Sequence, residues 1–224
     1  MKKRNFFFTL LIALSLLQTA YAQENTKDSG DVPTLNPIFG LKFNYTSAYN
    51  TANFSDGHNA QFKNRSGIGF GAFLDIPFSQ KWGIQLGLNY AQLGTKLTGF
   101  YSNIYYASTQ ILKYNYITIP LMAKYQIANS GLSIIAGPQI GILMSAKRYD
   151  GIGNNENVKS DLKSNDIAAI GGLEYTLPLK DFAHQIRIGA NYQAGLSNII
   201  KDISTNSYNK MYNNALSAYL AFAF

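Results

Sequence analysis

The chain has 224 residues, with 19 lysines and arginines against 12 aspartates and glutamates, a formal net charge of +7. Only 14% of the residues are charged, whereas a soluble globular domain carries about 25%. The absence of cysteine excludes disulfides and thiolate metal sites. The basic residues are scattered and form no stripe, which argues against a nucleic-acid partner.

The first 22 residues have the three parts of a secretory signal peptide. A positive head (Lys2, Lys3, Arg4) precedes a short apolar run, and Ala20 and Ala22 stand where a signal peptidase reads small residues. The run is too short to cross comfortably the ~30 Å of hydrocarbon in a bilayer. We therefore expect cleavage before Gln23, which leaves 202 residues (224 less 22) with 16 basic and 12 acidic side chains.

The rest of the chain lacks a membrane helix but has the composition of a membrane protein. No later stretch approaches the ~20 consecutive apolar residues that such a helix needs. The chain nevertheless contains 16 tyrosines, 14 phenylalanines and 19 glycines. Because only helices and closed barrels satisfy all backbone polar groups in lipid, these observations favour a membrane β-barrel.

Residues 23–36 are polar without periodicity and predict a flexible periplasmic lead-in. After them, apolar and polar residues alternate with period two in eight separate runs, each typical of a strand with two unlike faces. The runs span residues 41–46, 67–76, 82–90, 116–125, 132–142, 166–175, 185–193 and 216–224. The sequence thus predicts an all-β fold, an eight-stranded antiparallel transmembrane up-and-down barrel over residues 37–224.

The connections between these runs alternate in length. Short ones are expected at residues 77–81, 127–131 and 177–184, and long ones at 48–65, 95–111, 147–163 and 198–211. Short periplasmic turns and long external loops are typical of outer-membrane barrels. With an even number of strands, both termini are then expected in the periplasm.

Alternation alone does not say which face points outward, and a soluble ligand carrier has the same period with its apolar face inside. The polar face consists mostly of Gly, Ser, Gln, Asn and Thr, which is unusual for a surface washed by water. We therefore place the apolar face toward lipid. Pro120 and Pro138 each remove a ladder donor from a predicted strand, so a bulge is expected at one or both.

Several segments resemble the PorT-like outer-membrane β-barrel family. They are Asn115–Tyr125, Ala136–Gly141 followed by Ser145–Lys147, Pro77–Ser79 before Trp82, and Tyr192–Ile199. The resemblance covers nearly the whole mature chain, and members place prolines at matching positions. It implies an outer-membrane barrel without catalytic residues. The family's namesake serves a protein-secretion and gliding machinery, but no functional residue can be carried over to this chain.

Five charged residues are expected to point into the lumen near the periplasmic strand ends: Lys42, Asp75, Lys124, Glu174 and Arg187. An eight-stranded lumen is filled by side chains, and buried charges must pair. An ion-paired packing network is therefore favoured over a gate or a proton path. The strand number also argues against an aqueous pore.

No enzyme, cofactor or metal site is expected. A catalytic group needs a nucleophile and a base within hydrogen-bond reach, but His58 and His184 fall at opposite ends of the predicted barrel. Asp150, Glu156 and Asp161 lie in one loop without the regular calcium-loop spacing.

The external loops carry the functional hypothesis. Phe100, Tyr101, Tyr105 and Tyr106 lie in the second long loop, where a protruding hairpin could capture a partner by strand addition. The same aromatic side chains could instead pack on one another or rest at lipid headgroups. The expected function is that of a non-catalytic integral outer-membrane barrel, surrounded by outer-membrane lipid, that acts through protein contacts in a secretion machinery or at the cell surface. These contacts are expected at its extracellular loops or at its periplasmic turns. The alternatives are a barrel for envelope integrity and a lipid-modifying outer-membrane enzyme.

Overall fold

The computed structural model describes residues 36–54, 61–100, 107–127, 130–150, 153–177, 185–201 and 208–224. The predicted signal peptide and residues 23–35 of the lead-in lie outside these ranges, so both stay predictions. His58 and His184 also lie outside the described residues.

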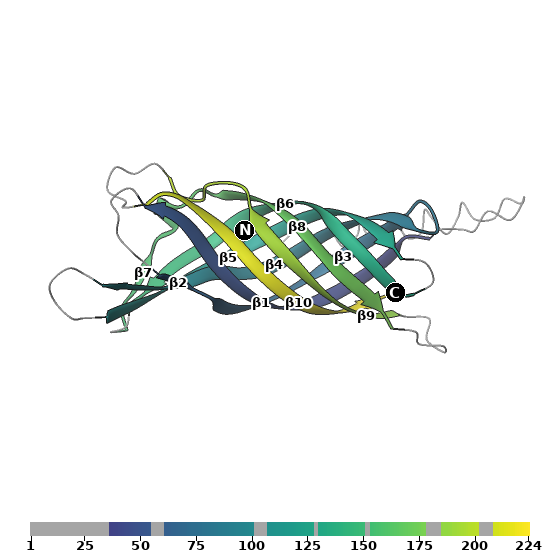
Figure 1. Ribbon diagram of the computed structural model, residues 1–224, viewed down its shortest axis with the longest axis horizontal. Coiled ribbons are helices and arrows are strands. Elements are labelled where there is room, and N and C mark those ends of the chain that lie inside the picture. Colours follow the sequence, from purple (N-terminus) through teal and green to yellow (C-terminus); the bar gives the residue numbers. More distant parts are fainter. Residues whose placement is uncertain are drawn as a thin grey trace, which may run out of the picture. The chain divides into compact units, whose positions relative to one another are not determined.

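Eight long antiparallel strands form a closed barrel (Figure 1). The strands pair in chain order, and the first pairs with the last, Gly40 opposite Ala223, so the sheet has no open side. They are β1 (Ile38–Phe54), β3 (Arg65–Pro77), β4 (Trp82–Phe100), β5 (Ala107–Gln126), β6 (Leu132–Tyr149), β8 (Asn165–Thr176), β9 (Gln185–Gly195) and β10 (Tyr208–Ala223).

The two ends of the barrel differ. At the terminal end, where β1 begins and β10 ends, a tight turn joins β3 to β4. At the far end lie two short strands, β2 (Gln61–Lys63) and β7 (Asn155–Asn157) (Figure 1). The 3-10 helix η1 (Lys159–Asp161) follows β7. β2 pairs with β4, and β7 pairs with β6. No helix in the described part of the chain is long and apolar enough to cross a membrane.

The outward face of the barrel is an apolar belt. Buried and exposed residues alternate along the strands, as in β3 and β6, and the exposed positions carry large apolar side chains. Examples 40–60% exposed are Leu41, Phe43, Phe70, Leu86, Leu88, Leu121, Ile140, Ile188, Leu220 and Phe222. Such a surface suits lipid rather than water. The soluble carrier, with its apolar face inside, is therefore wrong.

Aromatic residues border the belt. At the terminal end the rings of Trp82 and Tyr125 lie 4.7 Å apart between centroids. Toward the far end, the Phe70 and Tyr90 rings lie 5.3 Å apart, and Tyr45 is exposed beside them. These positions match the girdles at the two interfaces of membrane barrels.

Two sequence predictions about the strands were wrong. β1, β6 and β10 run into regions expected to be long loops. The extension of β4 and β5, which stay paired out to Phe100 and Ala107, is instead the protruding hairpin that was expected there. No bulge occurs at either proline, because the β5–β6 register is the same on both sides of Pro120 and Pro138. The register shifts instead between Asn115 and Tyr116. The Pro120 ring faces Gly87, which has no side chain to obstruct it.

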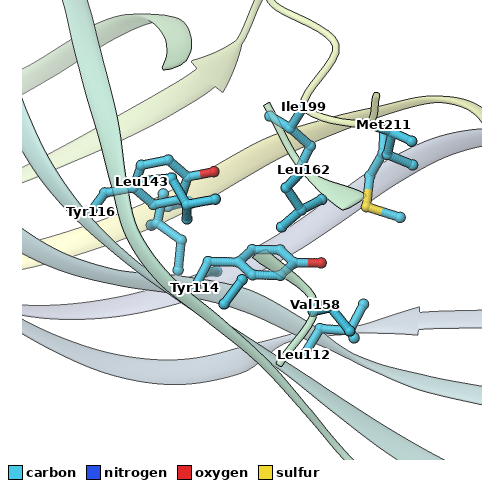
Figure 2. Close-up of a cluster of buried hydrophobic side chains, with 13 residues drawn as sticks. Leu112, Tyr114, Tyr116, Leu143, Val158, Leu162, Ile199 and Met211 are labelled. Atoms are coloured by element: carbon cyan, nitrogen blue, oxygen red, sulfur yellow. The ribbon is translucent and has the colours of Figure 1, made fainter. Parts of the chain in front are cut away.

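Two apolar layers fill the lumen. One, toward the terminal end, contains Phe73, Met122, Ile135, Ile170, Tyr219, Ala221 and Ala223. The other closes the far end, and we call it the plug; eight of its members are labelled in Figure 2. It contains Ala48, Leu93, Leu112, Tyr114, Tyr116, Leu143, Ala146, Val158, Leu162, Ile199, Ile200, Met211 and Ala215. Glycines make room for the larger rings, since a Cβ at Gly189 would collide with Tyr219 and one at Gly40 with Phe73. The lumen is thus packed as expected for eight strands.

Candidate functional site

The lumen near the terminal end holds a compact charge cluster, formed by Asp75, Lys124, Glu174 and Arg187. Lys124 Nζ lies 2.9 Å from Asp75 Oδ2 and 2.5 Å from Glu174 Oε1. Arg187 Nη1 lies 2.5 Å from the same oxygen of Asp75 and 3.2 Å from that of Glu174. Each carboxylate therefore contacts both cations. The cluster joins β3, β5, β8 and β9 across the barrel, and its formal charge is zero.

Neutral side chains complete the hydrogen bonding around the cluster. Gln85 Nε2 donates to Asp75 Oδ1 at 2.8 Å, and the Tyr219 hydroxyl donates to Glu174 Oε2 at 3.1 Å. Arg187 also donates to Gln185 Oε1 from Nε and Nη2, at 3.1 and 2.9 Å. The Arg187 side chain is only 2% exposed. Buried charges are tolerated when they are paired and hydrogen-bonded in this way.

Lys42 is the predicted lumen residue that the structure does not bring into an ion pair. Its side chain is buried, and its Nζ lies 5.2 Å from the centroid of the Tyr219 ring, a cation–π distance. Among the described carboxylates, none forms a salt bridge with it. The five predicted residues thus divide into four that share one network and one beside it.

A second group of buried polar side chains lies nearer the far end, around Asp166. These residues were not among the predicted site residues. Asp166 accepts hydrogen bonds from Asn213 Nδ2 at 2.8 Å and from Ser197 Oγ at 3.0 Å. Asn213 Nδ2 also donates to the Tyr116 hydroxyl, and Asn50 Nδ2 donates to Asn213 Oδ1 at 2.7 Å. Asp166 has the same strand parity as Glu174, so the alternation pattern could have placed it in the lumen.

Between the charge cluster and the plug lies a small polar cavity of about 50 Å³. Lys42, Asn89, Gln139 and Gln193 are among the residues that line it, and Gln139 Nε2 donates to Gln193 Oε1 at 3.0 Å. Asn89 Oδ1 and Gln193 Nε2 are buried without a hydrogen-bond partner. One is an acceptor and the other a donor, which suits enclosed water molecules.

The plug separates this cavity from the far end. Val158, Leu162, Ile199 and Ile200 come from the segments that follow β6 and β9, and all are at most 6% exposed. They pack against the strand residues Tyr114, Tyr116, Leu143 and Met211 (Figure 2). Apolar side chains from the connections therefore close the barrel from its far end.

We expect the purified barrel, reconstituted in a planar bilayer, to show no large and stable conductance. Eight strands leave a lumen just wide enough for side chains, and here the plug and the charge cluster occupy it. Single-channel recording is the measurement. Long-lived conductance steps in the unmodified protein would contradict the filled lumen.

The loop candidates are placed only in part. Phe100 ends β4, and its side chain is not described; Tyr101, Tyr105 and Tyr106 lie outside the described residues. The hairpin does protrude, but β2 covers the outer edge of β4 at Lys96–Thr98. The ladder groups of β4 at these three residues are therefore already paired, and strand addition at the rest of the hairpin stays a prediction.

The three loop carboxylates do not converge. Asp150 accepts two hydrogen bonds from Asn154, at 2.8 and 3.0 Å, and Glu156 lies 3.8 Å from Arg148. Asp161 accepts a bond from Ser160 Oγ at 2.9 Å. No group of three or more potential metal ligands occurs within the ranges that the structure covers.

A family model described as an outer membrane protein beta-barrel domain matches residues 21–201. The chain belongs to this family of outer-membrane β-barrel proteins. The outer-membrane barrel has no match among curated proteins.

Several solved structures are similar to the outer-membrane barrel at low sequence identity. Neisserial surface protein A is 12% identical, with 83% of this chain and 97% of that chain covered and a TM-score of 0.48. Ail, the attachment invasion locus protein of Yersinia pestis, is 17% identical (84% and 99% covered, TM-score 0.45). OprG of Pseudomonas aeruginosa is 13% identical (84% and 93% covered, TM-score 0.45).

Proposed function

We propose that this outer-membrane barrel is a non-catalytic protein that acts through protein contacts at its far end, as a component of a secretion machinery or of the cell surface. The length of its strands carries the proposal. A strand of about ten residues, tilted by about 40°, spans the ~25 Å apolar band of such barrels. β4, β5 and β6 have 19, 20 and 18 residues, so about half of each lies beyond the band.

The far end is also built as a fixed surface. β2 and β7 lengthen the ladders of β4 and β6 there, beyond the pairing with β3 and β8. The connections after β6 and β9 are anchored in the plug. Leu162 and Ile200 form a β-bridge between these two connections, and Lys163 N donates to Ile199 O at 2.7 Å. Interfaces that bind a partner without rearrangement require such order.

The proposal includes an orientation with both termini in the periplasm and the far end outside. The tight β3–β4 turn at the terminal end and the long projecting strands at the far end support it. A role like that of the PorT-like proteins, in secretion, is the specific form of the proposal. The packed lumen instead favours the alternative of a barrel that supports the envelope, because the described side chains fill the lumen apart from one small cavity.

Deleting the gene is expected to remove a defined set of proteins from the secreted and surface-exposed fraction, as measured by quantitative proteomics. A complementing variant in which an Asn-Gly turn replaces residues 100–107, closing the Gly99–Ser108 pair, is expected not to restore them. This variant removes all four aromatic loop candidates.

A variant shortened within residues 179–183, in the last connection at the terminal end, is the matched control and should restore secretion. An unchanged protein profile in the deletion strain, together with increased detergent sensitivity, would contradict the secretion role and support the envelope role.

A further inference from the structure

Four lysines form a row across adjacent strands at the far end: Lys63 on β2, Lys96 on β4, Lys113 on β5 and Lys147 on β6. Lys63 is directly opposite Lys96 in the β2–β4 ladder, and Lys113 is directly opposite Lys147 in the β5–β6 ladder. Lys96 is opposite Ile111, two residues from Lys113, so these two lysines are diagonal neighbours.

The lysine row lies on the outward face. The adjacent residues Thr95, Leu112, Tyr114 and Ala146 are buried in the lumen, so the lysines between or beside them point away from it. Lys63, Lys96 and Lys147 are exposed, and Lys113 is half-buried. Thr95 Oγ1 donates to the Lys63 carbonyl oxygen at 2.9 Å, which fixes β2 against β4 at this point.

Like charges directly opposite each other destabilise a sheet, and the row contains two such pairs. Within the described ranges, none of the four lysines forms a salt bridge with a carboxylate. The nearby Glu156 pairs with Arg148 instead. A row of four unpaired cations on one surface is complementary to an external group that carries several negative charges.

The depth of the row matches lipid headgroups. On the outward face of β5, the residues Leu121, Ile119 and Ile117 are followed by Asn115 and then by Lys113. On β4, Leu88 and Tyr90 are followed by Gln92 and then, past Gly94, by Lys96. Lys113 lies four residues beyond Ile117, or roughly 10 Å along the membrane normal at the usual strand rise and tilt. Long lysine stems reach back toward such an interface.

We propose that the lysine row binds the phosphate groups of an anionic lipid headgroup, so that the barrel carries ordered phosphorylated lipid beside β2, β4, β5 and β6. A lipid is favoured over a soluble polyanion because the row continues the lipid-facing surface and does not lie on top of the loops. In the orientation proposed above, the lipid is the phosphorylated glycolipid of the outer leaflet. The binding itself does not depend on the proposed contacts with protein partners.

The test compares the full-length mature barrel with a row variant, K63Q/K96Q/K113Q/K147Q. The matched control, K81Q/K163Q/K201Q/K210Q, removes the same charge from four other exposed lysines. Folding of each variant is checked by its shift in gel migration on boiling. Binding of fluorescent lipid A to the detergent-solubilised barrels is then titrated, with dephosphorylated lipid A and inorganic polyphosphate as comparison ligands.

We expect the row variant to bind lipid A at least about tenfold more weakly than the unmodified barrel, and the control to bind it within about twofold. The unmodified barrel should lose affinity to a similar degree for dephosphorylated lipid A. Equal lipid A binding by the row variant and the control would overturn the proposal. It would also be overturned if polyphosphate bound as tightly as lipid A, because the site would then not select a lipid.

Discussion

Replacing Arg187 by alanine is expected to lower the free energy of unfolding by about 3–5 kcal/mol. Arg187 contacts Asp75 and Glu174, and its removal leaves two buried carboxylates with Lys124 as their shared cation. The cavity left beside Phe73, whose ring centroid lies 5.3 Å from Arg187 Cζ, adds to the loss. The measurement is urea-induced unfolding in lipid vesicles, followed by the fluorescence of Trp82, the chain's single tryptophan.

Arg148→Ala is the matched control. Arg148 also pairs with a carboxylate, that of Glu156, but at 3.8 Å and with side chains 39% and 69% exposed. Exposed ion pairs contribute about 0–1 kcal/mol, so the unfolding midpoint should hardly move. An unchanged midpoint for Arg187→Ala would contradict the packing role of the charge cluster and favour a gate or proton path in its place.

Replacing Leu86 by arginine is expected to lower the free energy of unfolding by about 2–4 kcal/mol, because it puts a charge near the middle of the lipid-facing belt. Leu86 is 42% exposed, lies midway between Trp82 and Tyr90 on β4, and is opposite Leu74 and Leu121 on the neighbouring strands. The same unfolding measurement applies, and the yield of folded barrel on unboiled gels should fall as well.

Gln92→Arg provides the comparison on the same strand and the same face, six residues farther toward the far end. Near the interface such a charge costs about 0–1 kcal/mol. If Leu86→Arg and Gln92→Arg lowered the free energy of unfolding equally, the cost of the charge would not depend on its depth in the membrane. That result would contradict the position of the belt.

Much of this fold could be predicted because strand periodicity is local. In a strand, residues of equal parity share one face, so alternation put Phe43 and Leu121 on the apolar face and Arg187 and Glu174 on the polar face. The composition of the polar face, mostly small and uncharged, then assigned the apolar face to lipid. The parity of Asp75 and Lys124, together with their positions near the terminal ends of their strands, also predicted that the two side chains lie at the same height in the lumen. That pairing needed no long-range information, since all eight strands start or end at the same rim.

The remaining features depend on neighbours that are distant in sequence. Lys42 lies beside the charge cluster but outside the salt bridges, because two cations already satisfy its two carboxylates. Val158 and Ile199 lie in connections without periodicity, and only the closed barrel gives them a cavity to fill. The full length of the strands beyond the apolar belt could not be predicted, because the alternation of apolar and polar residues weakens there. The structure shows this part of the sheet through the pairing of β2 with β4 and of β7 with β6.

The seam between β1 and β10 makes this architecture a ring without a structural beginning. It has the same antiparallel ladder as the joints formed by hairpins, and Phe224 N donates to Phe39 O at 2.7 Å beside it. The hydrogen-bonded ladder therefore continues from the last strand to the first as it does between two strands joined by a short turn. The order in which the gene encodes the strands is one of several circular permutations that describe the same barrel.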